Sequence, residues 1–230
     1  MRKIHFAGLM FVLALALCAV AATSAFAVEE LPVWLVNQKT ITEPIAVKSE
    51  TDGLAILLED MGLKVDILVG ATNEGQLGET VGGVFNPMLD LISKITINST
   101  EKDEGAACGT LNKVAPVHLP WLTELVLSGG IIVDILLEDA GEAGTGKPGW
   151  EVECTTLGVK VKDVCELTEG KVEIKNVAGE EEVESIFKEP PTEPAECKGP
   201  IGAGEGLLEG INLILPVNAA LKIAASDVVE

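Results

Sequence analysis

The alternation of apolar and polar residues with a period of two constrains the fold of this chain more than any other feature. Residues 63–69 read Leu-Lys-Val-Asp-Ile-Leu-Val, residues 150–154 read Trp-Glu-Val-Glu-Cys, and residues 159–162 read Val-Lys-Val-Lys. Successive side chains of a β-strand point to opposite faces, so this pattern predicts strands with one buried face. Pairs such as Asp52-Gly53 and Gly129-Gly130 separate the apolar stretches, as turns do in an all-β protein.

We therefore expect an all-β fold, either an antiparallel two-sheet sandwich or a flattened barrel, with roughly a dozen strands. At most one short helix is expected, with Asn86 as its cap and Pro87 in its first position. The glycine-rich stretch 199–210 lacks the lysine and the strand–helix context of a phosphate-binding loop. A flexible surface loop is the expectation there.

Two parts of the chain resemble one another in sequence. Residues 56–62 read Ile-Leu-Leu-Glu-Asp-Met-Gly, and residues 135–141 repeat them with Ala in place of Met. This similarity predicts an internal duplication into two related units, about 28–113 and 114–230, within one domain. Chance similarity in a chain rich in Leu, Gly and Glu is the alternative.

The first 27 residues have the three parts of a secretory signal peptide. Arg2 and Lys3 provide a basic start, residues 6–22 are apolar, and Ala25-Phe26-Ala27 fits the site that signal peptidase recognises. We expect cleavage after Ala27 and a mature domain of residues 28–230 that is secreted or held at the cell surface.

Two alternatives to cleavage fit this segment less well. An uncleaved anchor is disfavoured because the apolar run is short for a bilayer span and is followed by Glu29 and Glu30 rather than basic residues. Lipidation of Cys18 would require a small residue before the cysteine, and Leu17 occupies that position. We therefore expect no membrane span in the mature chain.

The predicted mature domain is strongly acidic. Of the 16 basic residues, Arg2 and Lys3 lie in the signal peptide, which leaves 14 against 36 acidic residues and a net charge of −22 (14 − 36). Nucleic acids and anionic membranes attract clustered Lys and Arg, so neither is an expected partner. An extracellular or cell-surface partner is the remaining expectation.

Four cysteines follow the signal peptide: Cys108, Cys154, Cys165 and Cys197. An even number in an exported chain predicts two disulfides, with three connectivities open. The spacings do not contain the close pairs that zinc sites use, and a bound metal is not expected.

Three segments carry a resemblance to known proteins. Residues 120–125 (Pro-Trp-Leu-Thr-Glu-Leu), 149–154 (Gly-Trp-Glu-Val-Glu-Cys) and 157–161 (Leu-Gly-Val-Lys-Val) are similar to segments of a group of exported β-rich proteins of soil actinobacteria. The likeness is best between Val114 and Cys165. It implies export and a β-rich fold, and it implies no activity.

No arrangement typical of catalysis is evident in the sequence. The mature chain has a single histidine, His118, in an apolar setting where a structural role is the usual one. Acidic pairs such as Glu59-Asp60 and Glu138-Asp139 are numerous, but a carboxylate hydrolase needs two acids facing each other in a cleft. We expect no cofactor and favour a protein that is not an enzyme.

Calcium is the ion that best suits so many carboxylates, yet the spacing of a calcium-binding loop is absent. The weak candidates for calcium ligands are Glu101, Asp103 and Glu104, whose simpler interpretation is a solvated loop.

Three functional hypotheses follow from these observations. The first is a non-enzymatic structural or binding module at the cell surface or in the medium. The second is a carrier whose barrel encloses a small apolar ligand. The third is a secreted hydrolase that uses two carboxylates. The carrier requires an interior cavity, whereas a structural module should be packed solid.

Overall fold

β-Strands account for all the regular structure of the chain in the residues that the structure describes. The computed structural model describes residues 31–60, 64–102, 107–137, 146–167, 170–177, 182–188, 192–200, 202–218 and 222–226. These residues contain no helix, and every pairing between their strands is antiparallel. The strands are β1 (Val33–Val36), β2 (Lys39–Thr40), β3 (Ile45–Thr51), β4 (Ala55–Asp60), β5 (Lys64–Val81), β6 (Val84–Lys102), β7 (Thr110–Val117), β8 (Trp121–Ser128), β9 (Ile131–Leu136), β10 (Gly149–Thr156), β11 (Val159–Leu167), β12 (Gly170–Asn176), β13 (Val183–Phe187), β14 (Ala195–Gly199), β15 (Gly202–Pro216) and β16 (Ile223–Ser226).

Eight of these strands close into a barrel, which we call the closed ring. Its order is β13-β12-β9-β8-β6-β5-β3-β15, and pairing between β15 and β13 completes the circle. Closure leaves no unpaired edge, which is the usual solution to the hazard of exposed strand edges. The all-β prediction is confirmed, and of the two predicted arrangements the barrel is the one that describes this ring.

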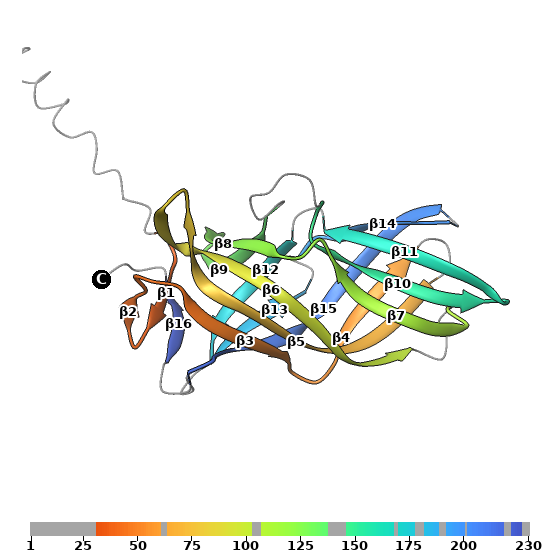
Figure 1. The fold of residues 1–230 in the computed structure, drawn as a ribbon, viewed down its shortest axis with the longest axis horizontal. Helices are drawn as coiled ribbons and strands as arrows, with labels where there is room; N and C mark the ends of the chain where they lie inside the picture. The colour runs from red at the N-terminus through yellow and green to blue at the C-terminus, as the bar shows by residue number, and fades with distance from the viewer. Residues whose placement is uncertain are drawn as a thin grey trace, which may run out of the picture. The chain divides into compact units, whose positions relative to one another are not determined.

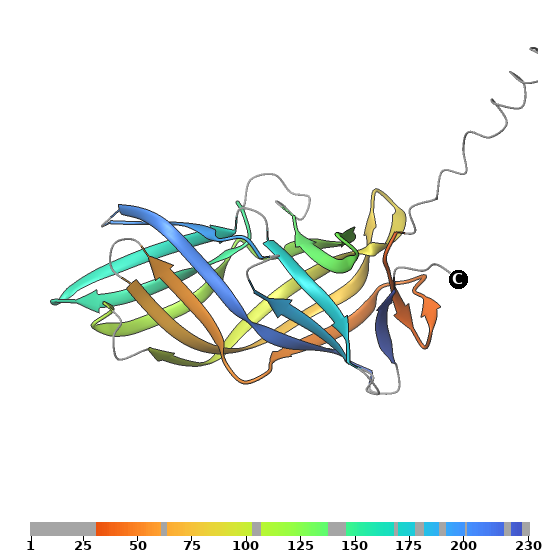
Figure 2. The same ribbon diagram turned by 180° about the vertical axis from the view of Figure 1, so that it is seen from behind.

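A second set of strands continues the barrel beyond the closed ring. Strands β5 and β15 are long enough to pair with β3 along one half and with β4 along the other. From β15 the sheet continues through β14, β11 and β10 to β7. Figure 1 shows these strands gathered at one end of the barrel, and Figure 2 shows β15 crossing from one set of strands to the other. We call the circuit β15-β4-β5-β6-β7-β10-β11-β14 the open ring.

The open ring is interrupted between β6 and β7. These strands lie in contact, but the described residues form no strand pairing between them. Among the described residues, β7 therefore forms backbone pairing only with β10. The part of β6 that follows the segment paired with β8 has β5 as its one neighbour in the sheet, again within the described residues. We call this line of contact the seam.

A small separate sheet, in the order β16-β1-β2, lies at the other end of the barrel (Figure 1). It contacts β6, β12 and β13. Trp34 of β1 is 1% exposed and packs with Ile174, Val183 and Leu125 of the closed ring. The small sheet is thus attached through a buried aromatic side chain, the type of residue with the largest apolar area to bury.

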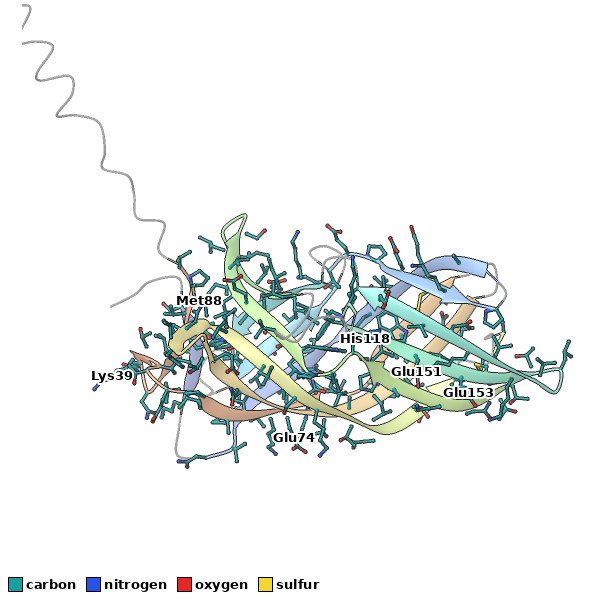
Figure 3. All side chains as sticks on the ribbon, turned by 45° about the horizontal axis from the view of Figure 1, so that its top comes forward. Lys39, Glu74, Met88, His118, Glu151 and Glu153 are labelled. Atoms are coloured by element: carbon teal, nitrogen blue, oxygen red, sulfur yellow. A yellow bond between two sulfur atoms is a disulfide. The ribbon has the colours of Figure 1, made fainter. Side chains whose placement is uncertain are left out.

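The open ring is filled by the larger of two apolar cores. The predicted alternation holds at Val65, Ile67 and Val69 and at Trp150 and Val152, which are buried. It is wrong at 159–162, where Val159 is 62% exposed, because this stretch starts β11 at the end of the hairpin with β10. Glu151 and Glu153, the polar neighbours of the buried residues of β10, lie on the outer face of that strand (Figure 3), where Glu151 is paired with lysines of the two adjacent strands. This is the pattern of strands with one face in a barrel interior.

Two disulfides brace the open ring, as the even number of cysteines predicts. Cys108 pairs with Cys154 of β10, and Cys165 of β11 pairs with Cys197 of β14. The first bridge joins the residues before β7 to the strand beside it, and the second joins register partners of neighbouring strands. Disulfides persist in oxidising compartments, so both bridges agree with an extracytoplasmic location.

The prediction of a flexible loop at 199–210 is wrong, because most of this stretch forms the start of β15. Its glycines serve close packing rather than flexibility. A Cβ at Gly206 would lie 2.5 Å from the Cys197 sulfur and 3.0 Å from the Trp150 ring. Glycine is used here because the disulfide and the indole occupy the space of a side chain.

The short helix suggested at Asn86 is also not formed, because the segment belongs to β6. Asn86 does cap locally, since its side-chain oxygen accepts a 2.9 Å hydrogen bond from the Met88 amide. That bond stabilises an irregularity in the strand: Asn86 pairs with Glu79 and Asp90 pairs with Leu77, so the β6 side has extra residues. A capping signal is local, and long-range pairing with β5 and β8 decides the outcome.

The predicted duplication stays a prediction. Its two matching segments begin in β4 and β9, which belong to the open and the closed ring respectively. The described residues from Leu31 onward form one compact unit. The signal peptide and its cleavage after Ala27 lie outside the described residues.

Candidate functional site

The interior of the barrel contains a partly open cavity of about 150 Å³. Its lining extends from Trp34, beneath the small sheet, to Trp150 in the open ring. Most of the lining is aliphatic or aromatic, and strands of both rings contribute to it. Both sides of the seam take part, with Ile95 and Ile97 from β6 and Val114 from β7.

A belt of polar side chains crosses this apolar interior within the closed ring. Strand register places these residues on the inner face, because cross-strand partners point to the same side of a sheet. Ser49 pairs with Asn73, Asp90 pairs with Thr123, and Ser185 pairs with Asn212. We call the following residues the polar belt: Ser49 (β3), Asn73 (β5), Asp90 (β6), Thr123 (β8), Asp134 (β9), Ser185 (β13) and Asn212 (β15), all of which line the cavity.

Asp90 is directed into the cavity by the irregularity of β6. Opposite it, Gly78 of β5 has φ = 75°, a left-handed conformation that favours glycine. A Cβ at Gly78 would lie 2.6 Å from the Phe85 ring and 2.8 Å from Ile41, so the position has no room for a side chain. The bulge thereby re-aims a side chain, which is a common use of bulges beside functional sites.

Two donors hold the Asp90 carboxyl group. The Gly78 amide donates to Oδ1 at 2.9 Å, and the Trp34 indole donates to Oδ2 at 2.5 Å. Asp90 is 5% exposed, and the small sheet thus contributes a hydrogen bond to the interior of the closed ring.

Asp134 and Thr123 are less well satisfied. Thr123 is fully buried, and neither its hydroxyl oxygen nor Oδ1 of Asp134 has a well-formed hydrogen bond, although the two side chains lie close enough for Thr123 to lower the pKa of Asp134. Asn73, across the belt, donates to Ser49 at 2.9 Å while its own oxygen is unpartnered. Buried polar atoms in folded proteins are normally paired, so three such atoms around one cavity are an unusual feature of this interior.

Both belt carboxyl groups favour the protonated state. Burial raises the pKa of Asp90 well above its usual value, and the charge of Asp134 adds to the effect, while the bonds from Gly78 and Trp34 oppose it. Burial likewise raises the pKa of Asp134 to about 7, against the opposing effect of Thr123. Two carboxylates so close in an apolar interior cannot both ionise easily.

The cavity lining contains no Lys, Arg or His among the described residues. The acidic side chains of the belt therefore have no cationic partner in this part of the protein. Asp90 and Asp134 lie on the same wall, on strands separated only by β8. This arrangement differs from the facing carboxylates that a glycoside hydrolase places on two sides of a bond.

The structure does not bring the sequence-predicted candidates to this cavity. His118 lies outside the lining, and its Nε2 is 3.1 Å from the Glu166 carboxylate. Glu101 is exposed on β6, whereas Asp103 and Glu104 lie outside the described residues. Among the described residues no group of three His, Cys, Asp or Glu side chains is placed to hold a metal ion.

Sequence reasoning missed Asp90, Thr123 and Asp134. The available signal was a lone acid within an apolar run, as in Leu89-Asp90-Leu91 and Val133-Asp134-Ile135. Charged residues are rarely buried without a purpose, so such positions stand out against the many solvated acids.

The fold and cavity define a closed antiparallel β-barrel with an acidic, mostly apolar interior. No known protein family matches the sequence, and no curated protein or solved structure matches it. The resemblance to exported actinobacterial proteins stays a prediction. No helix among the described residues has the length and apolar character needed to span a membrane.

Proposed function

We propose that this protein is an exported carrier that encloses a small, largely apolar ligand inside its barrel. The observation that carries the proposal is the cavity, because a protein with a purely structural role would gain stability by filling it. The signal peptide predicted by the sequence and the two disulfides support action outside the cytoplasm.

The size of the cavity limits the ligand. A cavity of about 150 Å³ with apolar walls accepts a molecule of the size of benzene. The ligand, or the part of it that enters the barrel, is therefore expected to have on the order of six to ten non-hydrogen atoms. The unpaired seam between β6 and β7, which the cavity lining reaches on both sides, is the expected route of access.

Ethylbenzene tests the proposal, because it has an apolar body of suitable size and no polar group. Titration followed by NMR should show saturable binding to one site, with shifts concentrated at the cavity lining. Ala71→Phe, on the inner face of β5, should fill the cavity and weaken binding at least tenfold.

Ala203→Phe is the matched control, because Ala203 is exposed near the start of β15 and does not line the cavity. It should leave ethylbenzene binding unchanged. Absence of saturable binding to the unmodified protein, or equal binding by both variants, would contradict the carrier function.

A further inference from the structure

We infer that Asp90, Thr123 and Asp134 form a recognition site for the ammonium group of a small amine whose apolar body fills the cavity. This inference deepens the proposed carrier function and rests on it. It is supported by the kind of atoms that lack partners, by the charge of the lining and by the surroundings of the site.

The unpartnered atoms of the belt are hydrogen-bond acceptors. The side-chain oxygen of Asn73 only accepts, Oδ1 of Asp134 only accepts when the carboxyl group is ionised, and the Thr123 hydroxyl both accepts and donates. An unpartnered buried acceptor is satisfied by a ligand that donates. An ammonium group carries three N–H donors and no acceptor, and it therefore matches this set of atoms.

At pH 8, where an Asp134 with a pKa of about 7 is ionised, its charge selects a cation rather than a neutral donor. Asp90 and Asp134 lie on strands that flank β8, with Thr123 of β8 paired to Asp90 in register. No basic side chain of the described residues lines the cavity. A cation supplied by the ligand would be the missing partner, and a charge-assisted hydrogen bond in an apolar interior is among the stronger polar contacts.

The surroundings of the three residues suit an apolar body attached to the ammonium group. Beside them the inner face carries Trp121, Leu136, Val172 and Phe187, all of which line the cavity. The belt would thus orient the ligand by one end while the apolar walls exclude water from the other, which is the usual division in small-molecule sites.

Protons compete with the amine at this site. The titratable residues of the lining are Asp90 of β6, Asp134 of β9 and Glu74 of β5, whose exposed carboxylate pairs with Lys94. Glu124 lies beside the two aspartates on the opposite face of β8. Acidification converts the carboxylates into neutral acids and removes the partner of the ammonium group. Binding is expected to weaken as the pH falls from 8 to 5.

Benzylamine and ethylbenzene provide a matched test, because they have similar size and shape and differ in the charged group. At pH 8 the unmodified protein should bind benzylamine at least tenfold more tightly than the Asp134→Asn variant does, because the variant loses a charge-assisted hydrogen bond. Ethylbenzene affinity should stay within about twofold in the same variant, because the apolar walls are intact. Lowering the pH to 5 should weaken benzylamine binding and leave ethylbenzene binding unchanged.

Thr123→Val provides a second variant that separates recognition from folding. It removes a buried hydroxyl that has no well-formed hydrogen bond, so the thermal stability of the free protein should change little, while benzylamine affinity should fall several-fold. A loss of stability without a loss of affinity would assign Thr123 a structural role only.

The outcomes distinguish the two proposals. Ethylbenzene binding without benzylamine binding, or benzylamine binding that Asp134→Asn leaves unchanged, would overturn the amine site and leave the carrier function standing. Failure of ethylbenzene to bind would reject the carrier function itself.

Discussion

Asp90 and Asp134 differ in how far the protein satisfies them, although both are buried in the same interior. Asp90 receives hydrogen bonds from an indole and a backbone amide, so its position is fixed from both sides. Asp134 has an oxygen without a partner and depends on Thr123 alone for local support. A buried acceptor without a partner lowers the stability of the folded protein. This loss of stability is expected where binding requires an acceptor that is free to contact the ligand.

Asp134→Asn should reduce the pH dependence of stability. The folded-state pKa of Asp134 is about 7, against an ordinary value of 3.8, so the folded state binds the proton more tightly than the unfolded state does. Stability therefore rises as the pH falls from 8 toward 5, and Asp134 should contribute about 2 kcal/mol to this rise. Urea unfolding at both pH values should show a smaller increase in Asp134→Asn than in the unmodified protein.

The ion pairs on the outer face do not contribute to the change in stability between pH 8 and pH 5. Their lysine partners lower the pKa values of Glu151 and Glu173 below the ordinary 4.5. Their contribution is complete above that value and is lost only as the pH falls further. An equal pH dependence in the variant and the unmodified protein would show that Asp134 is ionised as easily in the folded state as in the unfolded state.

At the scale of elements, the long strands decide the architecture. Strands β5 and β15 each pair with β3 and β4 in succession, and this sharing joins the closed ring to the open ring. Strand β6 is common to both rings, but it lies beside β7 without pairing. The seam is consequently the line along which the barrel is held by side-chain contacts rather than by a ladder of hydrogen bonds.

Hydrogen exchange should identify the seam. Strand β10 is paired on both sides, with β7 and β11, whereas β7 is paired with β10 alone. Amides of β7 that face β6 should exchange well before those of β10, because they lack a ladder partner. Mass spectrometry of peptides covering 110–117 and 149–156 would measure this difference. Equal protection of the two strands would mean that the seam is closed by backbone pairing and is not a route into the cavity.

For the whole molecule, the disulfides stabilise the part of the barrel that backbone pairing leaves incomplete. Both bridges belong to the open ring, and their sulfurs lie in its core, since Cys165 and Cys197 are 0% exposed and Cys108 is 1% exposed. The closed ring contains no cysteine and is held by a continuous circuit of strands. The two rings therefore depend on different kinds of interaction.

Reduction of the disulfides should require unfolding. Dithiothreitol alone should leave both bridges intact, because the sulfurs are inaccessible in the folded protein. Reduction in denaturant followed by refolding should lower the free energy of unfolding by about 2–4 kcal/mol for each bridge lost. Alkylation and mass spectrometry report the thiols, and thermal unfolding reports the stability. Rapid reduction of the native protein would contradict the buried placement of these cysteines.

The sequence alone determined the all-β class and, for several strands, which side is buried. At Val65, Ile67 and Val69 the alternation was sufficient, because the pleat of a strand converts a period of two directly into two faces. The even number of cysteines likewise predicted two bridges. Both inferences use local information or simple counting.

Only the tertiary structure decided which strands are neighbours. Backbone hydrogen bonds are the same at every residue, so alternation does not specify that β13 pairs with β15 and closes a ring. Asp90, Thr123 and Asp134 come from three different strands and become one site through the pairing of β8 with β6 and with β9, and through the bulge opposite Gly78. The polar belt and its cavity follow from closure, because an inner face becomes an interior only when the sheet meets itself.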